Sequence, residues 1–219
     1  MADPTCTIKA IIFDFGGVLM RTMSQEPRQR LAARFGLSPE ELSNIVFDSE
    51  ESLLEQMGEI APDARWQRLA RDLGLQSQQE LQTFLTEFFS ADVLDAELIA
   101  YLRRARASKR GCRSGRYKTA LLSNAWANLG ELLRDEFHID DCFDVIVISA
   151  VVHLMKPDPA IYHYTLSQLQ VAPEEAVFVD DSRRNVEAAA ALGIHAIQFT
   201  TREEVLEKLQ TLLQGEERA

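Results

Sequence analysis

Six polar residues of this sequence follow apolar runs, at the places where buried strands would end: Asp14, Ser123, Asn124, Lys156, Asp180 and Asp181. An ionisable group is costly inside a core and useful at the rim of a site, so this placement directs attention to chemistry. Carboxylates that converge repel one another and need a cation, and hard oxygen ligands suit Mg²⁺. Mg²⁺ together with a lysine and helix N-terminal amides fits a phosphoryl group. The residue types therefore predict phosphoryl chemistry at one site.

Asp14 lies at the end of the first apolar run of the sequence. It ends the apolar run Ile11-Ile12-Phe13, and the glycines Gly16 and Gly17 that follow allow the backbone a tight turn. A carboxylate can attack phosphorus and form an acyl phosphate, which splits one difficult hydrolysis into two easier steps. The sequence contains neither a GxxxxGK[ST] phosphate-binding loop nor a GxGxxG fingerprint, which disfavours a nucleotide-binding kinase or dehydrogenase.

Alternating strands and helices must position these side chains. Apolar runs predict five strands, at 7–14, 119–122, 145–148, 177–179 and 196–197. Apolar residues at helical spacing predict five helices, near 94–107, 126–137, 159–170, 183–192 and 202–213. This alternation is typical of an α/β fold with a Rossmann-like, doubly wound parallel sheet, covered by helices on both faces. Ligands bind beyond the carboxyl ends of such strands, where the six polar residues fall.

The segment between the first strand and the rest has a different pattern. Its apolar residues recur at helical spacing without a convincing strand, as in Leu81, Phe84, Leu85 and Phe88. Ser38 before Pro39 is typical of a helix start. We therefore predict a discontinuous core of residues 1–20 and 92–219, with an all-helical cap of residues 21–91 inserted after the first strand.

Charge and composition narrow the class of partner. The formal net charge of −11 argues against non-specific binding to nucleic acid or to an anionic membrane. The segment 109–116 is strongly basic, and we interpret it as a solvated loop at the amino end of the sheet. No coiled-coil heptads are present, so a monomer and a homodimer remain equally open.

The cysteines and the N-terminus bear on location. Cys6, Cys112 and Cys142 form no CxxC pair, so the pattern indicates neither a zinc site nor a disulfide framework. Residues 1–9 lack the features of a signal peptide, and no run of about 18 apolar residues occurs. We expect a cytoplasmic protein that acts on a small molecule.

The six polar residues form four motifs along the chain: Asp14, Ser123-Asn124, Lys156 and Asp180-Asp181. In this order, and with a helical insert after the first, these motifs resemble the haloacid dehalogenase-like hydrolase superfamily over nearly the whole chain. The resemblance implies that Asp14 is the nucleophile. It implies that Ser123, with Asn124 beside it, and Lys156 bind the transferring phosphoryl group, and that Lys156 belongs to the catalytic set.

The resemblance also implies a Mg²⁺ site. Asp14, Asp180, Asp181 and the backbone carbonyl of Gly16 would hold the ion, and Asn185 would orient a metal-bound water. The inserted helices resemble the cap that covers the site in this superfamily and sets substrate choice. Arg21, directly after the first hinge, is the cap arginine that we expect to reach the substrate.

One position departs from the pattern. Phosphatases of the superfamily usually carry a second Asp two residues after the nucleophile, as general acid and base, and this chain has Gly16 there. Metal binding should survive, because it uses the backbone carbonyl. The proton donor to the leaving group is lost, and such help is worth roughly 10²–10⁴-fold in rate.

Three functions follow from this combination. The leading hypothesis is a Mg²⁺-dependent phosphatase that prefers aldose 1-phosphates or acyl phosphates, whose leaving groups need the missing acid least. The second is a 2-haloacid dehalogenase, since halide leaves unprotonated, although the superfamily's dehalogenases lack an acidic pair like Asp180-Asp181. The third is a weakly catalytic or regulatory domain that keeps the fold and the metal.

Overall fold

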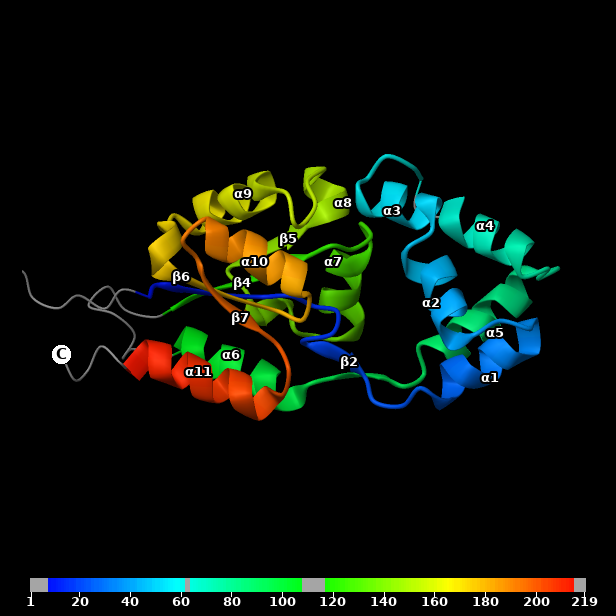
Figure 1. The fold of residues 1–219 in the computed structure, drawn as a ribbon, viewed down its shortest axis with the longest axis horizontal. Helices are drawn as coiled ribbons and strands as arrows, with labels where there is room; N and C mark the ends of the chain where they lie inside the picture. The colour runs from blue at the N-terminus through cyan, green and yellow to red at the C-terminus, as the bar shows by residue number, and fades with distance from the viewer. Residues whose placement is uncertain (1–7, 62–63, 108–116, 215–219) are drawn as a thin grey trace, which may run out of the picture.

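The computed structural model describes residues 8–61, 64–107 and 117–214, and the basic segment 109–116 lies outside these ranges. Five strands form one parallel sheet in the order β5-β4-β1-β6-β7 (Figure 1). The strands are β1 (Ala10–Phe13), β4 (Lys118–Ser123), β5 (Val145–Ile148), β6 (Ala176–Asp180) and β7 (His195–Gln198). The first strand is central, because a buried apolar run must be covered on both faces. The predicted α/β, doubly wound fold is confirmed.

Helices cover both faces of the sheet, as Figure 1 shows. One layer contains α9 (Pro159–Leu169) and α10 (Arg183–Ala191), which pack against even-numbered residues of β1 such as Ile12. The other layer contains α6 (Ala96–Ala107) and α11 (Arg202–Gln214), which pack against Ile11 and Phe13. Alternate side chains of one strand thus contribute to two cores, as the period of two residues in a strand requires.

A separate helical unit lies beside the sheet, on the right of Figure 1. It consists of α1 (Glu26–Phe35), α2 (Pro39–Phe47), α3 (Glu50–Gln56), α4 (Ala64–Asp72) and α5 (Gln78–Phe88). These helices enclose a core of their own, which includes the predicted Leu81, Phe84 and Phe88. Ser38 caps α2 as expected, with its hydroxyl accepting from Glu41 N and the Glu41 carboxylate accepting from Ser38 N.

Two short strands join the helical unit to the sheet, and the sequence reading missed both. β2 (Met20–Thr22) and β3 (Asp92–Leu94) pair antiparallel, with Arg21 opposite Val93. Strands of three residues are too short to show a period, and their partners lie about seventy positions apart in the chain. They lie next to the two ends of the predicted cap, residues 21 and 91, while the exact limits of core and cap stay a prediction.

The helix expected near 126–137 is shorter and irregular. It is α7 (Leu129–Glu131) followed by a π-helical turn at Leu132–Glu136, in which Phe137 N donates to Leu132 O. The start is delayed because Ala125 N donates to Ser149 Oγ, and that hydroxyl donates to Ala125 O, so the chain after β4 stays non-helical.

Three further short helices complete the chain: a 3-10 turn at Asp140–Cys142, α8 (Ser149–Val152) and a 3-10 turn at Pro173–Glu175. Within the described ranges, no helix combines the length and the apolar character that crossing a membrane requires.

Candidate active site

The strand ends gather the predicted residues at one edge of the sheet. Phe13, the last residue of β1, lies between Leu121 of β4 and Val179 of β6. Asp14 follows it directly, and Asp14 N donates to Val179 O at 2.9 Å. Ser123 and Asp180 are the final residues of the two flanking strands. The central strand therefore presents its carboxylate between the ends of both neighbours, as an open parallel sheet predicts.

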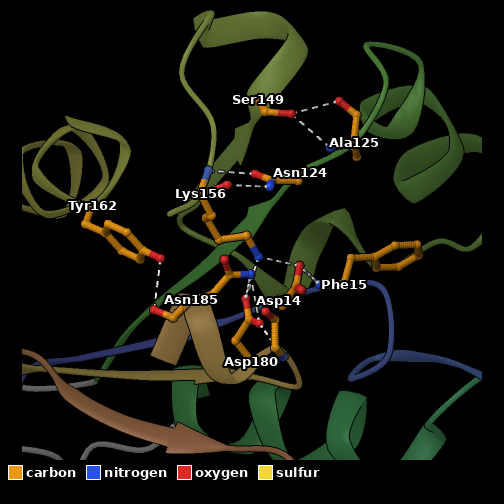
Figure 2. Close-up of polar contacts among 10 residues, drawn as sticks. Asp14, Phe15, Asn124, Ala125, Ser149, Lys156, Tyr162, Asp180 and Asn185 are labelled. Carbon is orange, nitrogen blue, oxygen red and sulfur yellow. Dashed lines mark hydrogen bonds and ion pairs between the residues drawn. The ribbon is translucent and has the colours of Figure 1, made fainter. Parts of the chain in front are cut away.

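Lys156 reaches these strand ends from the loop between α8 and α9 (Figure 2). Its ammonium lies 2.6 Å from Asp180 Oδ2 and 2.9 Å from Asp14 Oδ1. All three residues are buried, with exposures of 3% for Lys156, 7% for Asp14 and 0% for Asp180. One cation thus stands between two buried carboxylates, and the cluster carries a net negative charge.

The buried surroundings of Asp14 disfavour its ionised form. Burial raises the pKa of the Asp14 carboxyl to about 7, Lys156 opposes this rise, and nearby Asp180 adds to it. Phe15 N donates to Asp14 Oδ1 at 2.7 Å, which favours the ionised form. A second cation at this position would favour the carboxylate further.

A third carboxylate completes a set that fits such a cation. Ligand oxygens of Asp14, Asp180 and Asp181 all lie within 4.8 Å of one another. Asp181 packs against Gly17, which has φ +76° and where a Cβ would stand 2.2 Å from Asp181 Oδ2. Only glycine leaves room for this approach. Burial and Asp180 raise the pKa of Asp181 as well. Three converging hard oxygen donors are the chemistry that Mg²⁺ prefers.

Asn185 holds Asp180 in place. Its Nδ2 donates to both carboxylate oxygens of Asp180, at 3.1 and 3.2 Å, and Ser182 N donates to Oδ1 at 2.8 Å. The carbonyl of Asn185 accepts from the Tyr162 hydroxyl at 3.0 Å. The side chain that was expected to orient a metal-bound water thus contacts a predicted metal ligand. The Tyr162 hydroxyl of α9 holds the Asn185 backbone.

Asn124 holds Lys156 through the backbone. Asn124 Nδ2 donates to Lys156 O at 2.9 Å, and Lys156 N donates to Asn124 Oδ1 at 2.8 Å, as Figure 2 shows. Both ends of the amide are engaged, so Asn124 positions the lysine. Its contact with phosphate stays a prediction, and the observed pairing favours the positioning role.

These residues match a known pattern across the chain. The family model of the haloacid dehalogenase-like hydrolases matches residues 8–193. The chain belongs to this family.

Its haloacid dehalogenase-like relatives include phosphatases. A sesquiterpene phosphatase from Aspergillus oryzae is 29% identical over 194 residues, which cover 89% of this chain and 91% of the relative. A D-ribitol-5-phosphate phosphatase from Bacteroides thetaiotaomicron is 25% identical, with 87% and 91% covered. A HAD family enzyme from the same bacterium, solved in complex with magnesium and inorganic phosphate, has a TM-score of 0.68 at 21% identity, covering 89% of this chain and 96% of its own. The chain is thus a hydrolase related to phosphatases.

The departure from the family pattern at Gly16 is structurally open. Gly16 is exposed, and a Cβ at this position would meet nothing within 4 Å. No crowding at the Cβ position therefore demands glycine here. Gly17, by contrast, has both the positive φ and the close carboxylate.

The remaining two predicted residues differ in placement. Ser123 is buried at the end of β4, beside the Asp14 cluster. Arg21 instead contacts Asp95 Oδ2 at 2.5 Å and lies over the Phe199 ring. Asp95 also pairs with Arg202 and caps α6, where it accepts from Leu98 N. Arg21 therefore ties the hinge strand to the core, and its contact with substrate stays a prediction that these partners do not favour.

Sequence reasoning missed two residues whose hydroxyl groups hold the backbone near the site residues. Ser149, which is fully buried, fixes Ala125 at the end of β4, and Tyr162 supports Asn185. Both are ordinary types for a helix start and a helix interior. A hydroxyl among buried apolar neighbours is the one signal that marks them, since it must find a partner.

Proposed function

We propose that this hydrolase is a Mg²⁺-dependent phosphatase that moves the phosphoryl group of a small phosphorylated metabolite first to Asp14 and then to water. The observation that carries the proposal is the buried Asp14 carboxylate, 2.9 Å from Lys156 and within a set of three converging carboxylates. The phosphatase relatives support the same reaction class.

The first step is attack by Asp14 on phosphorus. Phe15 N and Lys156 Nζ both contact Oδ1, so we infer that Oδ2 attacks. The new bond joins Oδ2 to phosphorus, and the bond from phosphorus to the leaving oxygen breaks. Water then attacks the phosphorus of the aspartyl phosphate, inorganic phosphate leaves, and the Asp14 carboxylate is restored.

The surrounding residues supply charge and position. Lys156 and Ser123 lie beside Asp14, where an ammonium and a hydroxyl would donate to phosphoryl oxygens. Asp14, Asp180, Asp181 and the Gly16 carbonyl would hold Mg²⁺, which supplies positive charge to the transferring group when bound.

Gly16 sets the substrate preference. A glycine cannot protonate the departing oxygen, so the leaving group must depart with little help. Anomeric and acyl oxygens do so more readily than simple alkoxides. We therefore infer a preference for aldose 1-phosphates or acyl phosphates over simple alkyl phosphates.

Two features favour the phosphatase over the dehalogenase and the regulatory domain: the pair Asp180-Asp181 and the contacts of Lys156. Displacement of halide needs Asp14 and no metal, so it gives the three converging carboxylates no ion to hold. A purely regulatory domain would not need Lys156 held by both side-chain and backbone contacts.

A screen of phosphate release from small phosphometabolites, with Mg²⁺ and with a chelator, tests the proposal. We expect release that requires Mg²⁺ and falls by at least about 10³-fold in Asp14→Asn. Activity that survives Asp14→Asn would overturn the mechanism. Chloride release from 2-haloacids in the presence of chelator would favour the dehalogenase instead.

A further inference from the structure

A buried cation lies where the helical unit meets the core. Arg65 of α4 is 4% exposed, and its Nε lies 2.7 Å from Glu55 Oε2 of α3. Its guanidinium carbon lies 3.6 Å from the Trp66 ring centroid and 3.0 Å from that of Trp126. Trp126 belongs to the loop after β4, so Arg65 joins the cap to the edge of the active site.

Three hydrogen-bond donors lie buried at this junction without a hydrogen-bond partner. Among the described residues, they are Arg65 Nε, Arg65 Nη1 and Trp126 Nε1, and of these Arg65 Nε forms the ion pair with Glu55. Buried donors are satisfied in nearly all native structures, and each exception needs an explanation. These exceptions belong to two side chains that contact each other across the boundary between cap and core, and they point to a missing acceptor.

The surroundings of these donors fit a hydroxylated ligand. Phe47 stacks on Trp126 at 6.1 Å with an interplanar angle of 9°, and the Trp66 ring lies tilted at 5.8 Å from that of Trp126. Flat aromatic faces suit the carbon frame of a compact molecule. The Glu55 carboxylate beside Arg65 is an acceptor for hydroxyl protons, and its charge disfavours an additional anion.

The position of Trp126 suits the leaving group of the proposed reaction. Trp126 is three residues after Ser123, a span of at most about 11 Å along the chain. A ligand held by its phosphoryl group at Ser123 and Lys156 would extend its other end into this region.

We propose that Arg65 and Trp126 determine specificity by donating hydrogen bonds to hydroxyl oxygens of the leaving group, which selects polyol or sugar phosphates over hydrocarbon phosphates. This inference rests on the proposed phosphatase function. Its physical basis is that a site with buried donors rejects an analogue that leaves them unpaired far more strongly than it rejects a change in size.

The test compares two substrates that match in carbon number, a pentitol 5-phosphate and n-pentyl phosphate. We expect wild type to favour the pentitol ester in kcat/KM by at least about 100-fold. Trp126→Phe keeps the ring and removes the N–H, and Arg65→Lys keeps the charge and removes the fork. Each should lower the ratio of the two kcat/KM values by about tenfold.

Arg68→Lys is the matched control, because Arg68 lies one turn further along α4 and is exposed. It should keep the wild-type ratio. An unchanged ratio in Trp126→Phe and Arg65→Lys would overturn the inference. Release of phosphate from acetyl phosphate by wild type tests the phosphatase function alone, so the two failures are distinguishable.

Fluorescence supplies a measurement that needs no turnover. The chain has two tryptophans, so Trp66→Phe leaves Trp126 as the sole indole. In an Asp14→Asn, Trp66→Phe protein with Mg²⁺, we expect the pentitol ester to change the emission with a half-saturation at least about tenfold lower than n-pentyl phosphate. Equal half-saturation for the two esters would overturn the inference.

Discussion

Lys156 in the core and Arg65 in the cap are both buried cations beside carboxylates, and they differ in what surrounds them. Lys156 contacts two carboxylates through its ammonium and Asn124 through its backbone. Arg65 has one carboxylate partner and two tryptophan faces, and its Nη1 is unpaired. Burial lowers the pKa of Arg65 to about 9, although Glu55 opposes the shift.

The difference reflects where each cation is attached. Lys156 is held at the ends of adjacent strands, whose register fixes the distances among the groups. Arg65 lies on a helix of the cap and contacts the core through the ring of Trp126. A preorganised cluster suits the reaction, which is the same for every substrate, and an incompletely paired cluster suits recognition, which a ligand completes.

Removing the core cation should have the largest effect. Lys156→Met leaves Asp14 and Asp180 buried without their cation, and we expect a loss of about 3–5 kcal/mol in the free energy of unfolding, measured with urea. Mg²⁺ should stabilise this variant more than wild type, because the three carboxylates then lack their internal counter-ion. Lys9→Met, which removes a partly exposed ion pair with Glu175, should cost at most about 1 kcal/mol. Equal losses in the two variants would contradict the comparison.

Gly16→Asp tests the general acid and base that the active site lacks. A Cβ at this position meets nothing within 4 Å, so a side chain can begin here without a clash. We expect turnover of simple alkyl phosphates to rise by roughly 10²–10⁴-fold, with a much smaller gain for acyl phosphates. Gly16→Ala is the steric control and should gain nothing. The measurement is kcat/KM for both substrate types, and an equal gain for both would refute the role assigned to this position.

The sequence predicted the fold and the groups at the strand ends because both depend on local patterns. Apolar runs define strands, and the first polar residue after each run must lie at the edge of the sheet, as Asp14, Ser123 and Asp180 do. The convergence of the Asp14, Asp180 and Asp181 carboxylates was predictable for the same reason.

The supporting contacts were not predictable, because they join distant segments. Nothing in the sequence indicates that Asn124 pairs with the backbone of Lys156, or that Arg21 pairs with Asp95 at the hinge. Trp126 illustrates the same limit, since its partner Arg65 is on a helix about sixty positions earlier. Pairing at such separations depends on how two packed units meet, which no local period encodes.

Asn124→Ala examines how far the core cation depends on its backbone support. The substitution removes two hydrogen bonds to Lys156, and we expect a loss of about 1–3 kcal/mol in the free energy of unfolding, with a lower kcat. Asn128→Ala is the control in the same loop, because Asn128 is exposed and its side chain does not cap α7. It should stay within about 0.5 kcal/mol of wild type. A kcat of Asn124→Ala equal to that of wild type would show that Lys156 keeps its place unaided.

The smallest effect on stability is expected where the comparison is most direct, in the cap pair itself. The double variant Glu55→Leu, Arg65→Met replaces a buried ion pair with apolar side chains. Such replacements are commonly neutral or stabilising, because desolvation of both charges offsets their attraction. We therefore expect a free energy of unfolding within about 1 kcal/mol of wild type or above it, while Arg65→Met alone costs about 3–5 kcal/mol by leaving Glu55 buried without its cation. Urea denaturation of the three proteins measures this. A double variant as unstable as the single one would mean that the pair supports the cap fold. Stability retained together with loss of the preference for hydroxylated leaving groups would assign the pair to recognition.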